Sequence, residues 1–497
     1  MIWLIVLCMV GAIIGLWLFI RYRPPELYSL LLPRDQAIKI AVRSIQTLVG
    51  IDVSDWQRYA MYWYDRDTIN KLHHLGMLNR VRHVLYNWGL VESWRIRFVG
   101  PNQSILIGIS ALGEVTSLIV DIPKHKLPPV EGTADHADKV REALANAEDG
   151  LWNRCVATGS GEKTEDLQTT STYWYTAESP EMRMKLSVES FRGRIVHIHF
   201  EPEILTDGMG SAVKKEQLES TLGLTGFIGS FLALIAAILV LINLDVHPNL
   251  AVGILLGVIM FASNVLTVRE SVDLSIVNAY DARISVKAVA ILGILSTSLA
   301  GLATGLVAFL SSLAGIGLSE SMGLSLFAEP AKQIMVGISA GICCLGLFAW
   351  VMHVAERRGW LEISPELSSR SIFVAGYTIK QGLSMSLISS ISEEAIYRLL
   401  ALSAIWKLSG NEWLAIFVSS MLWSLVHQTA GFKPRWMRYV QLMLFGLILG
   451  YCFIQFGFIC VLLIHAVHNF VLVCLPLWNY RFSRKRTGEV RTEQSAL

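Results

Sequence analysis

The feature that most constrains this chain is a series of long apolar runs that carry almost no charge. The longest, residues 439–480, contains no Asp, Glu, Lys or Arg. A helix of about 20 apolar residues crosses the hydrocarbon core of a bilayer, so this run is long enough for two crossings, joined near Gln455, Phe456 and Gly457. With 53% hydrophobic and 16% charged residues, the chain has the composition of an integral membrane protein.

The other apolar runs predict about nine crossings in total. They are residues 2–20, 222–244, 249–268, 288–319, 333–354, 371–408 and 413–432. If 371–408 crosses once, one orientation places most flanking basic residues in the cytoplasm, as the positive-inside bias requires. We therefore expect a multi-pass protein, of a bacterial plasma membrane, with its amino terminus outside and residues 24–215 in the cytoplasm. Two crossings in 371–408 would instead place residues 24–215 outside. The net charge of +2 and the lack of a basic cluster outside the membrane flanks give no reason to expect a nucleic-acid partner.

Residues 24–215 have a different character, with charges throughout. Arg21 and Arg23 follow the preceding run, 2–20. A cleaved signal peptide carries its positive charge before the apolar stretch instead, so we interpret 1–23 as an anchor. Alternating apolar and polar residues then predict two sets of strands. The sets are 94–99, 105–110 and 115–122, then 172–177, 183–190 and 195–200, preceded by helices at 35–49 and 138–147. This pattern predicts a duplicated α+β soluble domain, in which residues 159–164 form an exposed turn.

Ionisable and amide side chains interrupt three of the later apolar segments. An ionised group in hydrocarbon costs a few kcal/mol, so such groups usually face a shared polar interior and mark a function. Their segments read SEEAIYRLL, IFVSSMLWSLVH and LLIHAVHNFVL. The candidate site residues in these segments are Glu393, Glu394, Arg398, His427, His465 and Asn469.

Helical spacing indicates which of these side chains can meet. Residues four apart lie on one face of a helix, so Glu394 and Arg398 can form a buried ion pair. Glu393, about 100° around the helix, is then free to point elsewhere. Trp423 and His427 share a face in the same way, and so do His465 and Asn469.

These motifs, in this order, resemble those of the CPBP intramembrane proteases, a family that includes the CAAX prenyl endopeptidases. The resemblance covers roughly residues 371–480. The chain differs from the family in having Trp423 where Phe is usual, and Tyr397-Arg398-Leu399 in place of Phe-Arg-Gly. The resemblance implies an endopeptidase that acts in the lipid bilayer on a membrane-associated or lipidated protein or peptide, in CAAX-type processing or peptide maturation.

The chemistry that we expect is hydrolysis by an activated water. Glu393 would take a proton from a water that His427 also holds, and His465 and Asn469 would stabilise the oxyanion. Glu394 and Arg398 would hold the helix and set the electrostatics of Glu393. We expect metal-free chemistry because Asn469 is a poor zinc ligand, but a zinc site with Glu393, His427 and His465 as ligands stays open.

The predicted fold is therefore an all-α polytopic membrane helix bundle with an α+β soluble domain inserted after the first helix. Its parts are the anchor 1–23, the soluble domain 24–215, accessory transmembrane helices 216–370, the catalytic bundle 371–480 and a basic tail 481–497. The soluble domain shows no nucleophile–base or metal-ligand pattern, so we expect it to capture a substrate or partner.

Two alternatives belong to other functional classes. A non-catalytic scaffold or self-immunity protein would tolerate replacement of Glu393. A proton-coupled transporter would show repeated hydropathy halves with broken helices in matching positions, and this sequence does not show them.

Overall fold

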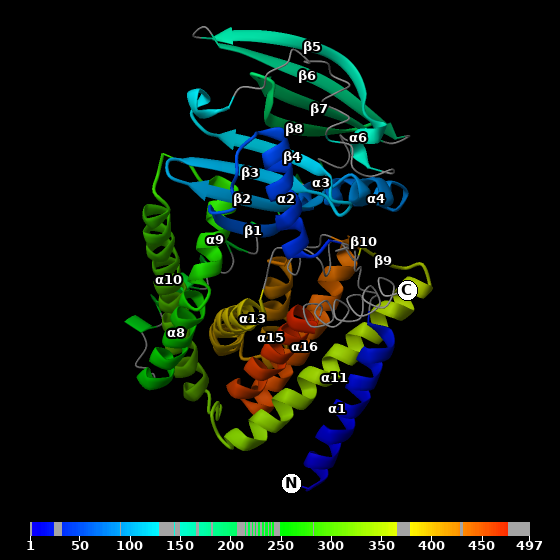
Figure 1. Cartoon of the computed structure of the whole chain (residues 1–497). Coiled ribbons are helices and arrows are strands. Elements are labelled where there is room, and N and C mark those ends of the chain that lie inside the picture. The colour runs from blue at the N-terminus through cyan, green and yellow to red at the C-terminus, as the bar shows by residue number, and fades with distance from the viewer. Residues whose placement is uncertain are drawn as a thin grey trace, which may run out of the picture.

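The structure, a computed structural model, describes ten stretches of the chain and seventeen further positions between 144 and 242. The stretches are residues 2–23, 32–89, 91–128, 150–165, 168–179, 182–205, 249–281, 283–364, 378–427 and 431–475. The expected helix 138–147, apart from residue 144, and the tail 481–497 lie outside the described residues, and so does about half of the run 222–244, whose described positions are helical. Among the described residues, a sheet domain lies across one end of a helix bundle (Figure 1).

The sheet domain is built on eight antiparallel strands in the order β1-β2-β3-β4-β8-β7-β6-β5. Each half is a run of four consecutive strands, and the halves join where Leu118 of β4 pairs with Ile198 of β8. All six strands expected from the sequence are present, and β1 and β5 are additional. The strands are β1 (Gln57–Tyr64), β2 (Glu92–Gly100), β3 (Gln103–Ile109), β4 (Val115–Asp121), β5 (Val156–Glu165), β6 (Gln168–Ser179), β7 (Met182–Phe191) and β8 (Arg194–Ile204).

The turn expected at residues 159–164 is wrong, because these residues lie in β5 and pair with β6. Two glycines in this strand make room for an aromatic ring. A Cβ at Gly161 would lie 2.8 Å from the indole of Trp174, and one at Gly159 would lie 3.4 Å from it. Glycine in a strand often marks such a close approach.

Helices and buried aromatic residues complete the core of this domain. In α2 (Arg34–Leu48), the buried residues Ala37, Ala41, Ile45 and Leu48 follow helical spacing and pack in the same hydrophobic core as the strands. Trp152 is fully buried and donates from Nε1 to the Val115 carbonyl at 2.7 Å. The smaller elements are α3 (Arg66–His74), α4 (Leu78–Asn87), η1 (Lys124–Lys126) and α6 (Leu151–Arg154).

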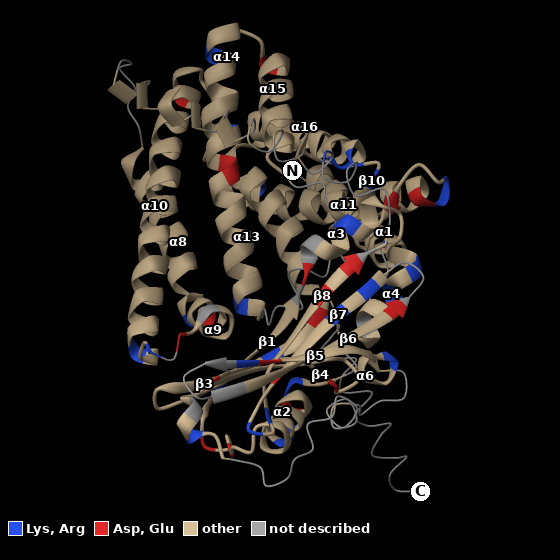
Figure 2. Ribbon diagram, turned by 90° about the horizontal axis from the view of Figure 1, so that it is seen from above, with Lys and Arg blue, Asp and Glu red and all other residues tan. Residues whose placement is uncertain are grey.

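In the described part of the chain, five helices are long and apolar enough to cross a membrane. They are α1 (Ile2–Tyr22), α10 (Val286–Ser321), α11 (Pro330–Arg357), α16 (Trp436–Phe456) and the helix Phe458–Leu475. A sixth results if α8 (Leu250–Val265) and α9 (Val268–Ala279), which are bent by 41°, form one span. The predicted break in the run 439–480 is confirmed, because Gly457 separates the last two helices with a φ of 99°. Figure 2 shows that charged residues gather on the sheet and at the helix ends.

The expected number of nine crossings is not confirmed. The run 413–432 forms only a 14-residue helix, α15 (Glu412–Leu425), which is short for a full crossing. Beyond it, a two-stranded ribbon of β9 (Glu362–Ile363) and β10 (Phe432–Lys433) precedes α16. The described part of 371–408 is continuously helical through α13 (Ile379–Glu394), the π-helix η3 (Ala395–Leu402) and α14 (Ser403–Ser409). It starts at a capping box between Thr378 and Gln381.

The sheet is attached to the helix bundle through α9. Arg97 of β2 is buried, and its guanidinium donates to the Val277 carbonyl at 3.2 Å and the Tyr280 carbonyl at 3.4 Å. A cation at the carboxyl end of a helix complements the unpaired carbonyls there. Around it, Val99 packs in one hydrophobic cluster with Ile276.

Candidate active site

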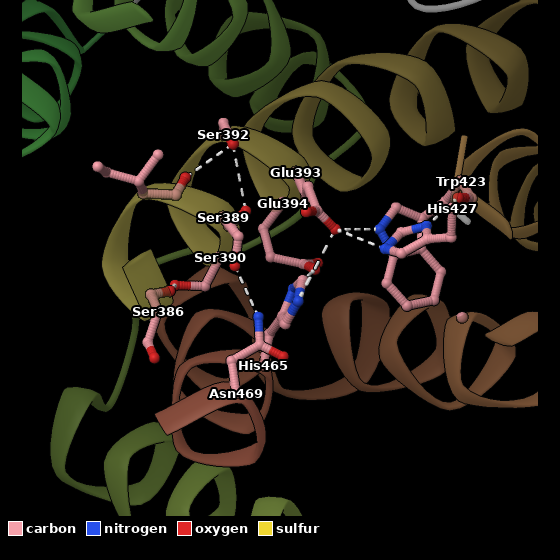
Figure 3. A network of polar contacts seen from close by, with 12 residues as sticks. Ser386, Ser389, Ser390, Ser392, Glu393, Glu394, Trp423, His427, His465 and Asn469 are labelled. Atoms are coloured by element: carbon pink, nitrogen blue, oxygen red, sulfur yellow. Dashed lines mark hydrogen bonds and ion pairs between the residues drawn. The ribbon is translucent and has the colours of Figure 1, made fainter. Parts of the chain in front are cut away.

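The two adjacent glutamates at the end of α13 point to different partners (Figure 3). Glu394 is fully buried, and its Oε2 lies 3.3 Å from Nε of Arg398. Its Oε1 lies 2.6 Å from Nδ1 of His465. Arg398 is also fully buried and places its guanidinium over the Trp423 ring, 4.8 Å from the centroid. The predicted ion pair is thus present, and it also holds an imidazole.

Glu393 faces three other side chains with a single oxygen. Its Oε2 accepts a hydrogen bond from Nε1 of Trp423 at 2.5 Å. The same oxygen lies 3.5 Å from Nε2 of His427 and 3.8 Å from Nε2 of His465. Side chains from α13, the end of α15 and the helix Phe458–Leu475 therefore meet at one carboxylate oxygen.

The protonation of both imidazoles follows from what their Nδ1 atoms contact. Nδ1 of His427 lies 2.8 Å from the Trp423 carbonyl oxygen, which can only accept, so this nitrogen must carry a proton. Nδ1 of His465 lies in the same way against the Glu394 carboxylate, which also contacts Arg398, and we assign this nitrogen as the donor. Each ring therefore presents Nε2 to Glu393, as a proton acceptor when neutral and as a donor when doubly protonated.

Asn469 lies one helical turn after His465, and its Nδ2 donates to Oγ of Ser389 at 2.6 Å. That contact uses one of the two amide protons and leaves the other free to donate. Ser389 lies one turn before Glu393 on α13 and was not predicted as a site residue. Its spacing of four residues from Glu393 was the signal that could have identified it.

A cavity of about 310 Å³ lies against this network. Glu393, His427, His465 and Asn469 line it, whereas Glu394 and Arg398 do not. Four of the six predicted residues are therefore open to a bound molecule, and the other two support them from behind. Half of the twelve other lining residues are apolar: Phe348, Met385, Leu442, Phe445, Leu472 and Val473. Cavities of this kind, with a few convergent polar groups, are the usual form of ligand sites.

Further polar residues of the cavity had no predicted role in the site. Trp423 was placed on the face of His427, but its hydrogen bond to Glu393 could not be inferred from spacing. His468 also lines the cavity, with its ring centroid 4.6 Å from that of Phe445. Arg438 and Gln441 also line it and are considered below.

The structure adds no support to a zinc site. Within the stretches that it describes, no group of three or more His, Cys, Asp or Glu side chains has an arrangement that could hold a metal ion. The proposed ligands Glu393, His427 and His465 converge, as described above. Chelation experiments test whether activity depends on a metal.

Comparison with known proteins adds two findings. A family model described as type II CAAX prenyl endopeptidase Rce1-like matches residues 375–471, which contain all six predicted site residues. Over 475 residues the chain is 49% identical to the sporulation-killing factor biosynthesis protein SkfC of Bacillus subtilis (strain 168), and the match covers 95% of each chain. No solved structure matches the chain.

Proposed function

Because this chain belongs to the Rce1-like family of type II CAAX prenyl endopeptidases, we propose that it is an intramembrane endopeptidase that hydrolyses a membrane-associated peptide with an activated water. The observation that carries this proposal is the convergence of His427 Nε2 and His465 Nε2 on one oxygen of Glu393 beside the cavity. A carboxylate and an imidazole that share a water can remove its proton as it attacks a carbonyl carbon.

In the first step, water binds between Glu393 and Nε2 of His427. Glu393 takes one proton from it, and the water oxygen forms a bond to the peptide carbonyl carbon. The carbonyl oxygen becomes an oxyanion, which the free amide proton of Asn469 can stabilise. The C–N bond then breaks, and protonated Glu393 returns its proton to the leaving nitrogen.

His465 can donate to the oxyanion only with a proton on Nε2, since its Nδ1 proton is committed to Glu394. In this mechanism it acts as an imidazolium, and the buried Glu394 carboxylate stabilises that cation in the way a triad aspartate does. Arg398 holds Glu394 in place. The pair is thus assigned a positioning role, which agrees with its location outside the cavity.

The substrate that we propose is a peptide undergoing maturation rather than a prenylated protein. The support is the similarity to SkfC, whose name states a role in the biosynthesis of a sporulation-killing factor. The sheet domain, which lies against α9 at one end of the bundle, is proposed to capture this peptide or a partner that delivers it.

The test compares the membrane-associated peptides of cells that express the wild-type protein with those of cells that express Glu393→Gln or His427→Ala. We expect mass spectrometry to find a new terminus in a small peptide with the wild-type protein only. Glu320→Gln, which removes an exposed carboxylate at the end of α10, is the matched control and should behave like the wild type. The same terminus with Glu393→Gln would instead favour a non-catalytic scaffold.

A further inference from the structure

The cavity has a second polar region on α16, separate from the glutamate and the histidines. Arg438, Gln441, Leu442 and Phe445 all line the cavity and follow helical spacing, so they form one face of α16. At one end of this face, the Phe445 ring packs against the His465 ring, with 6.2 Å between centroids. Arg438 lies at the other end, two turns away.

Arg438 has fewer polar contacts than a guanidinium can make. Its Nη1 donates to Oε1 of Gln441 at 2.7 Å, and its Cζ lies 5.1 Å from the centroid of the Phe432 ring. No ion pair of Arg438 occurs among the residues that the structure describes. A half-buried arginine beside apolar side chains is costly unless an anion pairs with it, and four of its five N–H donors remain.

Gln441 completes the donor set. Its side-chain carbonyl accepts from Arg438, so the amide group keeps two protons for another partner. The guanidinium and this amide thus offer several donors to a bound group, while the Gln441 oxygen is turned towards Arg438. A carboxylate, with two oxygens in one plane, is the group that such an arrangement binds best.

We propose that Arg438 and Gln441 bind a carboxylate of the peptide substrate, either its C-terminal carboxylate or an Asp or Glu side chain. This assignment rests on the proposed function, because it takes the peptide to occupy the same cavity. Arg438 and Phe445 are seven positions apart in the sequence, which is about 10 Å along the helix axis. An extended peptide covers that length in about three residues, so the bound carboxylate lies about three residues from the bond that is cleaved.

An arginine near a helix end at a membrane surface commonly extends to lipid phosphates instead. Arg438 is the third residue of α16, so lipid binding is the rival role. The position of Arg438 in the wall of the cavity that holds Glu393 favours the peptide. The two roles separate by experiment, since a lipid anchor does not distinguish peptides that differ only in a carboxylate.

The test uses the full-length Glu393→Gln protein in nanodiscs of phosphatidylcholine, so that peptides bind without turnover. A pool of short apolar peptides is added, each in a free-acid and an amidated form, with Asp and Asn exchanged in turn at the internal positions. Bound peptides are quantified by mass spectrometry. From the strength of charge-assisted hydrogen bonds we expect the carboxylate forms to be enriched roughly 10- to 100-fold. Enrichment at the terminus or at an internal position identifies the source of the carboxylate.

Adding Arg438→Gln should bring the acid-to-amide ratio to about one, and Gln441→Leu should lower it. Lys433→Gln, which removes an exposed cation five residues earlier, should leave it unchanged. Equal binding of acids and amides with Arg438 present, or an unchanged preference in Arg438→Gln, would overturn the proposal. The proposal would also be overturned if Arg438→Gln weakened peptide binding only in nanodiscs with phosphatidylglycerol, and equally for free-acid and amidated peptides. That result would identify Arg438 as a lipid anchor. If carboxylate peptides bind preferentially but the wild-type protein does not cleave them, the proposed hydrolase function is refuted and the carboxylate site is retained.

Discussion

Replacing Arg398 by Met should show how much the buried ion pair contributes to stability. Arg398 and Glu394 are both fully buried, and the variant leaves the Glu394 carboxylate with His465 as its remaining polar partner. Removing one member of a buried pair leaves an uncompensated charge, which costs about 3–5 kcal/mol in the free energy of unfolding. Removing both charges in Glu394→Gln with Arg398→Met should bring stability to within about 1 kcal/mol of the wild type, or above it.

The same double variant should hydrolyse peptide slowly although its fold is stable. It removes the anion that holds Nδ1 of His465 and stabilises its imidazolium. Loss of a carboxylate that orients a functional histidine typically costs about 10- to 100-fold in activity. We therefore expect peptide turnover to fall by roughly 10² while the fold is retained, a separation that a purely structural role for Glu394 does not produce.

Stability can be followed by the alkylation rate of the buried thiols Cys452 and Cys460 in micelles with increasing denaturing detergent. Arg283→Gln, which breaks the exposed Asp281–Arg283 pair, is the control and should not change this rate measurably. The reasoning fails if Arg398→Met unfolds within 1 kcal/mol of the wild type, or if the double variant turns over peptide at the wild-type rate.

Other predictions concern the oxyanion, the metal and the orientation in the membrane. Asn469→Ala should lower kcat by roughly 10²- to 10³-fold, as loss of one oxyanion donor does. Ser389→Ala should lower kcat less than about tenfold, because Ser389 only orients the Asn469 amide. Equal losses in the two variants would contradict these roles. Metal-free hydrolysis predicts that chelators leave turnover unchanged, and activity that is lost to a chelator and restored by stoichiometric zinc would refute it. Ser160→Cys on the exposed strand β5 should resist an impermeant thiol reagent in intact cells if the sheet domain is cytoplasmic; native Cys155, only 1% exposed, cannot serve as this probe.

Helical spacing was sufficient to predict much of the candidate site. It placed Glu394 with Arg398 and left Glu393 pointing elsewhere, and the structure has both arrangements. It could not supply the distances between helices, so the joint approach of His427 and His465 to Glu393 rested on the cost of polar groups in a membrane. The catalytic roles of these residues stay predictions.

Other features leave little trace in hydropathy. The run 413–432 carries no charge before His427, but its helix ends after Leu425, and the His427 ring bonds back to the Trp423 carbonyl. The π-helix at Ala395–Leu402 depends on backbone hydrogen bonds that no side-chain pattern reports. Such π-segments often occur at functional sites. Arg438 lies just before the uncharged run 439–480, so an argument based on charge-free segments passed over it.

The hydrogen bonds from Arg97 to the end of α9 couple movement of the sheet to movement of the helices. The sheet cannot tilt over the bilayer without either breaking those guanidinium bonds or pulling α9, and with it α8, to which a short bend joins it. The Ser384 hydroxyl of α13 donates to the Ser263 carbonyl of α8. Helix α13 ends in the two glutamates. If a captured peptide displaced the sheet, the displacement would therefore pass through α9, α8 and α13 to the two glutamates.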